Sequence, residues 1–267
     1  MTPARPAVEA KALRVGTTPA ILHTQHGLLA DWRSYMETRL NRPVEIVQRD
    51  SYQEAMELLR SEQVDLAWIC SYPYVYLRKQ VRLLAVPLYR AQPYYRAYLI
   101  VSARHPEYQS LYQMRKKIFA YTDPYSFTGY LVPRYQLRKM GEDPAKFFAK
   151  TFFTYSHDKL IEAVADGLAL GGSVDGYVWD SLGALKPEIT RRTLVVNKSP
   201  EFGFPPLVAR RTLPQADFAA LQKMLLAMRH DSQGKELLQR LNLDGFIAGN
   251  PSLYDGVAEM MRAFGEA

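Results

Sequence analysis

The sequence predicts an α/β protein built from two domains, and three observations lead to this expectation. The 267 residues exceed one average domain length, so the chain has room for two domains of roughly 100 to 150 residues each. Short apolar runs alternate with stretches of helical periodicity, as strands and helices do in a doubly wound parallel sheet. The same alternation restarts near residue 117, where a second domain would begin.

The first β-α-β unit opens the chain. Residues 13–15 are a periodic segment that ends in a Gly/Thr/Pro turn at 16–19, which indicates a short buried strand. Large apolar residues between 27 and 40 recur at helical spacing, and Asn, Arg and Pro at 41–43 end that helix. A second strand follows at 44–47.

A further helix, at about 52–61, leads to the apolar run VDLAWIC at 64–70. An uninterrupted apolar run is typical of a central parallel strand that is covered on both faces. We expect a polar, aromatic loop after it. This places Cys70, Ser71 and Tyr72 at the carboxyl end of the strand, where ligands bind in open α/β sheets. The run AYLIVS at 97–102 is one more apolar strand.

The second half of the chain repeats the alternation. The apolar run at 117–121 predicts a strand, followed by a loop and a helix through about residue 140. The remaining elements are expected as a helix at 158–166, a strand at 174–179, a return crossing at 194–196 and 206–209, and helices at 214–228 and 232–241. The C-terminal part would rejoin the first domain.

Composition and charge exclude several classes of protein. The net charge is +7, but the basic residues are scattered among acidic ones, which argues against a nucleic-acid surface. The single cysteine, Cys70, excludes an intrachain disulfide and a CxxC metal or redox motif, and we find no cofactor motif. No apolar run approaches the roughly 20 residues that span a bilayer. The N-terminus lacks the apolar core of a signal peptide, so in an exported protein this would be the mature part.

The segment TDPYSFTGYLVP, residues 122–133, is the most informative part of the sequence. It predicts a strand end followed by hydroxyl residues and a glycine at the start of a helix. Unpaired N–H groups and the dipole at a helix start favour an anion, and Ser126 and Thr128 can add hydroxyl donors. On local pattern alone, either hydroxyl could simply cap the helix.

This segment resembles the DPxSTSGxLVP-like segment of the periplasmic phosphonate/phosphite/phosphate-binding family. The resemblance also includes VDLAW, a Tyr-rich segment before LIV, a lone His before an amphipathic helix and a later VD pair, and it extends over residues 13–243. It implies a type II periplasmic-binding fold, in which two α/β lobes joined by a two-strand hinge enclose an interdomain cleft. The lobes would be residues 12–100 with 204–267, and residues 101–203.

The resemblance assigns binding roles to five residues. Ser126 and Thr128 correspond to hydroxyls that contact the oxyanion, Tyr52 and Tyr95 to tyrosines that reach the ligand from the first lobe, and His157 to a ligand-contacting histidine. Each has a structural alternative, since any one of 18 tyrosines can be packing and His157 can cap its helix.

Three departures from the family pattern bear on the ligand. Phe127 replaces the middle hydroxyl of the STS triplet, and Pro205 stands where relatives that bind an aminoalkyl group carry an acid, which disfavours an aminoalkylphosphonate. The third departure is Cys70. A buried cysteine is usually inert, but a thiol at an oxyanion site could bind arsenite, and the family includes arsenite-sensing members.

Asp175 ends a predicted strand that faces the cleft. A carboxylate beside an oxyanion is unfavourable unless the ligand carries a proton or a cationic group, so Asp175 could instead orient a donor such as His157. We therefore count Phe127, Cys70, Tyr72 and Asp175 among the ligand-binding candidates.

The sequence thus predicts a binding protein. His157, Asp175, Asp180 and Ser126 match no nucleophile elbow, P-loop or zinc motif, so no enzyme is expected. We expect a monomeric periplasmic protein, without metal or cofactor, that captures a small oxyanion and presents it to an ABC transporter permease or to a membrane sensor kinase. The alternative is an arsenite-binding sensor that uses Cys70 and signals to a histidine kinase.

Overall fold

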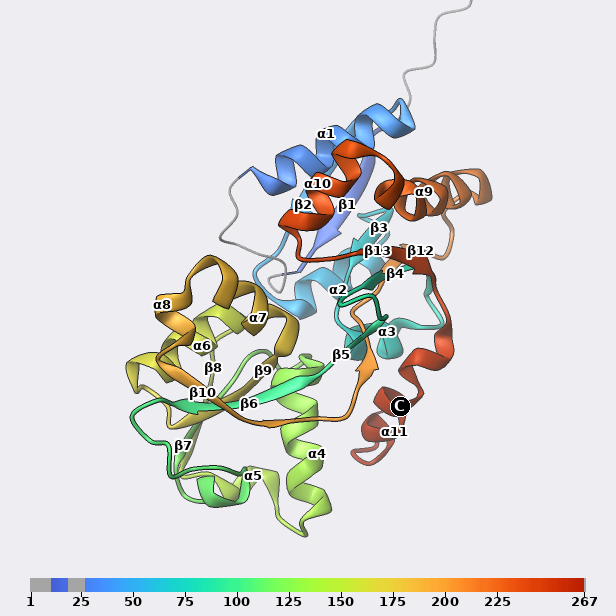
Figure 1. The fold of residues 1–267 in the computed structure, drawn as a ribbon. Coiled ribbons are helices and arrows are strands. Elements are labelled where there is room, and N and C mark those ends of the chain that lie inside the picture. The colour runs from blue at the N-terminus through green and yellow to red at the C-terminus, as the bar shows by residue number, and fades with distance from the viewer. Residues whose placement is uncertain (1–10, 19–26, 267) are drawn as a thin grey trace, which may run out of the picture.

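The computed structural model describes residues 11–18 and 27–266, which form two α/β lobes, each built around one mixed sheet (Figure 1). The last residue of the turn predicted at 16–19 lies outside the described residues. None of the helices in these ranges is long and apolar enough to cross a membrane.

The first lobe contains a six-stranded sheet in the order β13-β4-β12-β3-β1-β2. Its strands are β1 (Leu13–Thr17), β2 (Val44–Gln48), β3 (Leu66–Trp68), β4 (Val81–Leu88), β12 (Leu207–Arg210) and β13 (Gly245–Ala248). β1 pairs in parallel with β2 and β3, whereas β12 and β13 run antiparallel to their neighbours. The sheet is therefore mixed and not the parallel sheet that was expected, because β12, which brings the chain back from the second lobe, runs opposite to β3 and β4.

The helices of this lobe are α1 (Leu28–Leu40), α2 (Tyr52–Arg60), α3 (Ser71–Leu77), α9 (Gln215–Ala227), α10 (Ser232–Arg240) and α11 (Asp255–Arg262), with the 3₁₀ turn η3 (Met228–His230) between α9 and α10 and η4 (Pro251–Tyr254) before α11. A capping box between Ser51 and Glu54 begins α2. α1 packs on the sheet through Trp32, whose ring meets Trp68 edge to face at 5.6 Å.

The second lobe contains a five-stranded sheet in the order β10-β6-β9-β7-β8. Its elements are β6 (Ala97–Ser102), η1 (Tyr112–Met114), β7 (Ile118–Tyr121), the π-helix η2 (Phe127–Leu131), α4 (Val132–Lys139), α5 (Pro144–Phe147), β8 (Lys150–Phe153), α6 (His157–Asp166), β9 (Gly171–Asp175), α7 (Gly176–Leu185), α8 (Pro187–Thr190) and β10 (Thr193–Lys198). β7 is parallel to β8 and β9, and β6 is antiparallel to β9 and β10.

The chain crosses between the sheets twice. The outward crossing contains β5 (Tyr94–Tyr95) and the return crossing contains β11 (Phe202–Gly203), and these two strands pair antiparallel. Figure 1 shows this ribbon where the chain passes between the lobes. The whole of β6 belongs to the second sheet, so a lobe limit after residue 100 would divide a strand.

Two expected elements differ from the structure. The loop predicted after 64–70 is the helix α3, and Pro73 is accommodated in its first turn because N–H groups there have no intrahelical acceptor. The strand predicted at 174–179 ends at Asp175, whose carboxylate accepts the backbone N–H groups of Tyr177 and Val178 and so starts α7.

Candidate functional site

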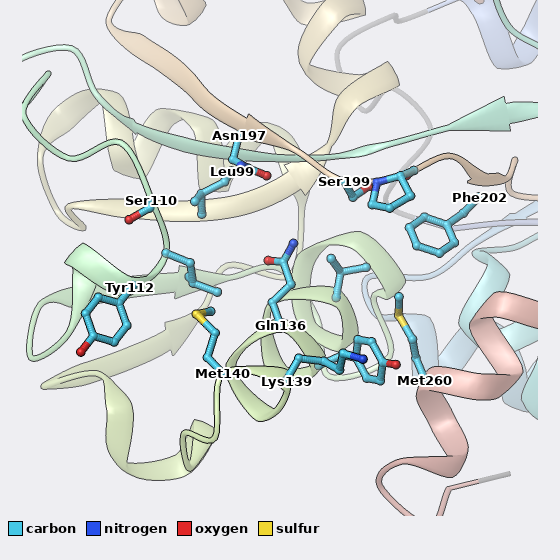
Figure 2. Close-up of a pocket in the computed structure, with 14 residues that line it drawn as sticks. Leu99, Ser110, Tyr112, Gln136, Lys139, Met140, Asn197, Ser199, Phe202 and Met260 are labelled. Atoms are coloured by element: carbon cyan, nitrogen blue, oxygen red, sulfur yellow. The ribbon is translucent and has the colours of Figure 1, made fainter.

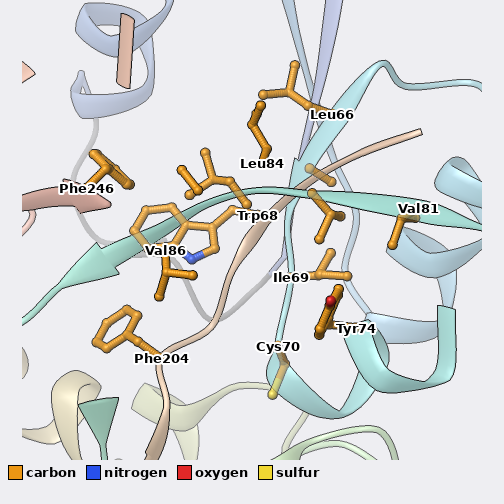
Figure 3. Close-up of a cluster of buried hydrophobic side chains, with 14 of the residues drawn as sticks. Leu66, Trp68, Ile69, Cys70, Tyr74, Val81, Leu84, Val86, Phe204 and Phe246 are labelled. Atoms are coloured by element: carbon orange, nitrogen blue, oxygen red, sulfur yellow. The ribbon is translucent and has the colours of Figure 1, made fainter. Parts of the chain in front are cut away.

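A contact between the lobes marks the centre of the site. Cys70, the N-cap of α3, accepts a hydrogen bond from the backbone N–H of Phe127 at the start of η2, with 3.4 Å between nitrogen and Sγ. Figure 3 shows Cys70 at the end of the apolar cluster around Trp68, with its sulfur directed away from that cluster. Burial raises the pKa of the thiol to about 11, so the sulfur is protonated at neutral pH.

The start of η2 supplies the two predicted hydroxyls. Ser126 caps this helix, because its Oγ accepts the N–H of Gly129 at 3.0 Å. The carbonyl of Thr128 is fixed to β9 by the Ser173 hydroxyl at 2.5 Å. The Thr128 hydroxyl itself is buried and has no hydrogen-bond partner among the described residues. A buried polar group without a partner costs free energy, and among the described residues the Thr122 hydroxyl and the Trp32 indole N–H are in the same state.

Gly129 is required where η2 follows β7. Thr122 directly follows β7, and a Cβ atom at Gly129 would lie 1.8 Å from its Oγ1. The absence of a side chain lets the helix start approach the sheet closely.

His157, the first residue of α6, is held as a neutral donor. Its Nδ1 accepts the backbone N–H of Asp175 at 3.0 Å, and burial lowers the pKa of the imidazole to about 3. A neutral imidazole with Nδ1 as acceptor carries its proton on Nε2. The expected orienting contact between Asp175 and His157 therefore exists, but the backbone of Asp175 makes it, not its carboxylate.

The carboxyl of Asp175 stands at the end of β9 and is buried. Its Oδ1 accepts the N–H groups of Tyr177 at 2.8 Å and Val178 at 3.4 Å. Burial raises the pKa of this carboxyl to about 7 despite these bonds. Near neutral pH, Asp175 is thus present in both the charged and the neutral form.

The two predicted tyrosines of the first lobe are both buried. The Tyr95 hydroxyl is 2.9 Å from Ser71 Oγ, which lies 3.2 Å from the carbonyl of Gly203. Burial raises the pKa of both Tyr52 and Tyr95, and the charge of an ionised Cys70 would raise it further.

Two of the predicted residues have other surroundings. Phe127 offers only its backbone N–H, because its ring packs against Phe202 of the hinge ribbon at 4.8 Å. The side chain of Tyr72 is directed elsewhere: its hydroxyl donates to the carboxylate of Glu266, and its ring packs on Tyr125 at 6.0 Å.

Two residues near the site were not predicted, Asp123 and Ser173, whereas Ser71 was expected at the cleft beside Cys70. Asp123 connects the lobes, because its Oδ2 accepts the backbone N–H of Tyr52 at 3.2 Å. The DP pair of the 122–133 segment was visible in the sequence and could have indicated this residue, whereas nothing local singles out Ser173.

A second group of contacts joins the lobes through α7. The Oδ2 of Asp180 accepts hydrogen bonds from the Tyr89 hydroxyl at 2.5 Å, from Arg90 at 2.9 Å and from the Tyr98 hydroxyl at 3.1 Å. Tyr89 and Arg90 follow β4 in the first lobe, whereas Asp180 is in the second. We call the cluster of Asp180, Tyr89 and Arg90 the α7 latch. The α7 latch and the buried contacts from Phe127 to Cys70 and from Tyr52 to Asp123 hold the two lobes together, so the lobes are closed in this structure.

Two α/β lobes, a two-strand hinge and buried donors between the lobes define a two-lobed solute-binding protein of the type II periplasmic class. Residues 16–254 match the family model described as the phosphonate, periplasmic substrate-binding protein of ABC transporters. The chain belongs to this family, whose members are binding components of transporters. Within the described residues, no group of three or more His, Cys, Asp or Glu side chains could hold a metal ion.

Solved structures share the fold. PhnD1 from Prochlorococcus marinus, in complex with methylphosphonate, superposes with a TM-score of 0.85 at 21% identity and covers 96% of this chain and 99% of its own. A binding component of an ABC phosphonate transporter from Pseudomonas aeruginosa gives 0.84 at 22% identity, with 93% and 85% covered. The aliphatic sulphonate binding protein SsuA from Escherichia coli gives 0.65 at 14%, with 95% and 92% covered. None of these comparisons supports the arsenite-sensing alternative.

Proposed function

We propose that this protein captures a small phosphorus oxyanion, of the phosphate, phosphite or phosphonate class, in the cleft between its lobes. The observation that carries the proposal is the Thr128 hydroxyl, which is buried at a helix start and has no partner among the described residues. A ligand oxygen would satisfy this donor and would also meet the positive end of the helix dipole.

The other donors of the site are neutral. Ser126 keeps its hydroxyl proton while its oxygen accepts from Gly129, and His157 offers Nε2–H. Donors that are already fixed in a buried site bind an anion strongly, because little reorganisation is needed and water does not compete.

The lobe limits follow from the sheets. We propose residues 12–96 with 204–267 as the first lobe and residues 97–203 as the second, so that the limit predicted after residue 100 moves and β6 stays whole. A ligand that touches Thr128 on one lobe and Tyr95 on the other favours the closed form. The closed, monomeric protein would then dock on the permease of an ABC transporter in the periplasm.

The head group of the ligand is expected to be small and without an amine. At Pro205, the backbone carbonyl is occupied by the indole N–H of Trp68 at 2.9 Å, and the position offers no carboxylate for an ammonium group. Methylphosphonate, which is bound in PhnD1, is therefore a better test ligand for this protein than an aminoalkylphosphonate.

The test is a titration by thermal shift and by calorimetry with phosphate, phosphite, methylphosphonate and 2-aminoethylphosphonate. We expect at least one of the first three to raise the unfolding midpoint, because a ligand that binds only the folded state stabilises it. Ser126→Ala should weaken binding, whereas Ser61→Ala, which removes an exposed hydroxyl at the end of α2, should not. No shift with any phosphorus oxyanion would refute the proposal.

A further inference from the structure

An open apolar groove lies on the second lobe, outside the cleft. It has a volume of about 430 Å³ and is bounded by α4, by the β6–β10 edge of the sheet, by the return crossing and by α11 (Figure 2). Leu99, Val132, Phe202 and Met260 supply apolar walls. Volumes of about 300 to 1,000 Å³ with mostly apolar walls are typical of small-molecule sites.

The groove carries one positive charge, which favours an anionic ligand over a neutral or cationic one. Lys139 is the one charged side chain among the described residues that line it, and those residues include no carboxylate. The amide of Gln136 extends into the middle of the groove (Figure 2). Met140 at its edge is 42% exposed, so apolar surface is available for an occupant.

The walls of the groove belong to parts that move against each other if the lobes open. Met260 is on α11 of the first lobe, whereas Val132 is on α4 of the second, directly after η2. Phe202 lies in the hinge ribbon, and its ring meets Phe127 edge to face at 4.8 Å. An occupant of the groove therefore touches both lobes and the hinge ribbon, and through Phe202 the ribbon packs on Phe127 of η2, the element that carries the Thr128 hydroxyl.

The geometry points to a second binding site in this groove, for a small amphipathic anion with an apolar body and one carboxylate or sulfonate group. An occupant that fits the walls as they stand here stabilises the closed lobes and so raises the affinity of the cleft for its oxyanion, reciprocally. The binding part is independent of the proposed function, whereas the coupling part rests on it.

The probe is 1-anilinonaphthalene-8-sulfonate, whose fluorescence rises in apolar surroundings, with N-phenyl-1-naphthylamine as the same ring system without the sulfonate. We expect the sulfonate to bind one saturable site and the neutral probe to bind at least about fivefold more weakly, as the charge on Lys139 requires. Lys139→Glu should weaken sulfonate binding about tenfold, which corresponds to about 1.4 kcal/mol. Lys146→Glu on α5, whose side chain is 85% exposed, is the matched control and should not change it.

Gln136→Trp fills the groove and should abolish probe binding, with an unchanged unfolding midpoint as evidence of folding. Wild-type probe affinity in this variant, or equal binding of the neutral probe, would overturn the anion site. A dimer that Gln136→Trp converts to monomer would assign the groove to self-association and would also overturn it.

The coupling is tested by titrating methylphosphonate with and without saturating sulfonate probe, and we expect about a fivefold gain in affinity. An unchanged affinity would overturn the coupling. If no phosphorus oxyanion binds while the probe does, the coupling and the proposed function fail together, and the groove site stands.

Discussion

Replacing Thr128 with valine should stabilise the unliganded protein and weaken its ligand binding. Valine has nearly the same shape and removes a buried hydroxyl that has no partner among the described residues. Such a group costs about 1–3 kcal/mol, so a gain of about 1 kcal/mol and a rise in Tm of about 2–4 °C are expected. In the complex, a hydrogen bond to a charged ligand contributes about 1.5–3 kcal/mol, so the Kd should rise about 10- to 100-fold.

Calorimetric melting without ligand and titration with methylphosphonate measure the two effects. Thr122→Val is the matched control, because the Thr122 hydroxyl is also buried and has no partner among the described residues. It differs in position, since it lies directly against Gly129: a Cβ atom built on Gly129 would be 1.8 Å from the Thr122 Oγ1. The control should gain stability and keep its Kd. A lower Tm for Thr128→Val with an unchanged Kd would show that Thr128 has only a structural role.

Three further predictions concern the latch, the buried carboxyl and the thiol. Asp180→Asn should weaken the α7 latch, enlarge the protein in small-angle scattering without ligand and weaken oxyanion binding about tenfold, since the charged hydrogen bond from Arg90 is lost; an unchanged scattering profile would contradict this. The carboxyl of Asp175 has a pKa of about 7 in the folded protein and roughly 4 in the unfolded chain, so its contribution to stability is complete below about pH 4 and is lost as pH rises to about 7. The free energy of unfolding, measured with denaturant from pH 4 to 9, should show this fall in the wild type and not in Asp175→Asn. Cys70→Ser should keep the thermal shift given by methylphosphonate, and iodoacetamide should leave the folded wild-type thiol unmodified at pH 8, because burial raises its pKa to about 11; rapid alkylation would refute the buried position.

The elements that the sequence predicted well are those whose signal is local. β6 has the bounds predicted from its apolar run, and α1 ends where Asn41 takes a left-handed conformation. β4 was not predicted; it contains Pro87, which weakens a strand signal, and its pairing with β13 joins segments far apart in sequence. A local sequence pattern cannot indicate a pairing between segments so far apart.

The same limit separates Tyr95 from Tyr72. Both belong to Tyr-rich segments, and both were predicted at the ligand. The difference is tertiary: Tyr95 pairs with Ser71 beside the thiol, whereas Tyr72 donates to Glu266, which is 194 residues away in sequence. Neither partner can be read from the residues around the tyrosine, so the direction of each side chain needs the structure.

The described residues gathered at the site include no lysine or arginine, and if the site binds an oxyanion as proposed, we expect selection among anions to depend on protons as well as on charge. Oδ1 of Asp175 accepts two backbone N–H groups, so we expect Oδ2 to be the oxygen that meets a ligand. A phosphonate monoanion carries an acidic proton near neutral pH and can donate it to this oxygen. Sulfate carries none, and it would meet the carboxylate as a second negative charge.

Wild-type protein should therefore bind methylphosphonate and exclude sulfate at pH 8, above the pKa of about 7 for Asp175. Asp175→Asn keeps an oxygen acceptor for the N–H groups that start α7, but its neutral amide can donate to a fully deprotonated anion. The variant should gain sulfate binding, measured by calorimetry at pH 8, and lose part of its preference for methylphosphonate. Equal exclusion of sulfate by both proteins would show that Asp175 has no part in selection and that its buried carboxyl serves only to cap the helix.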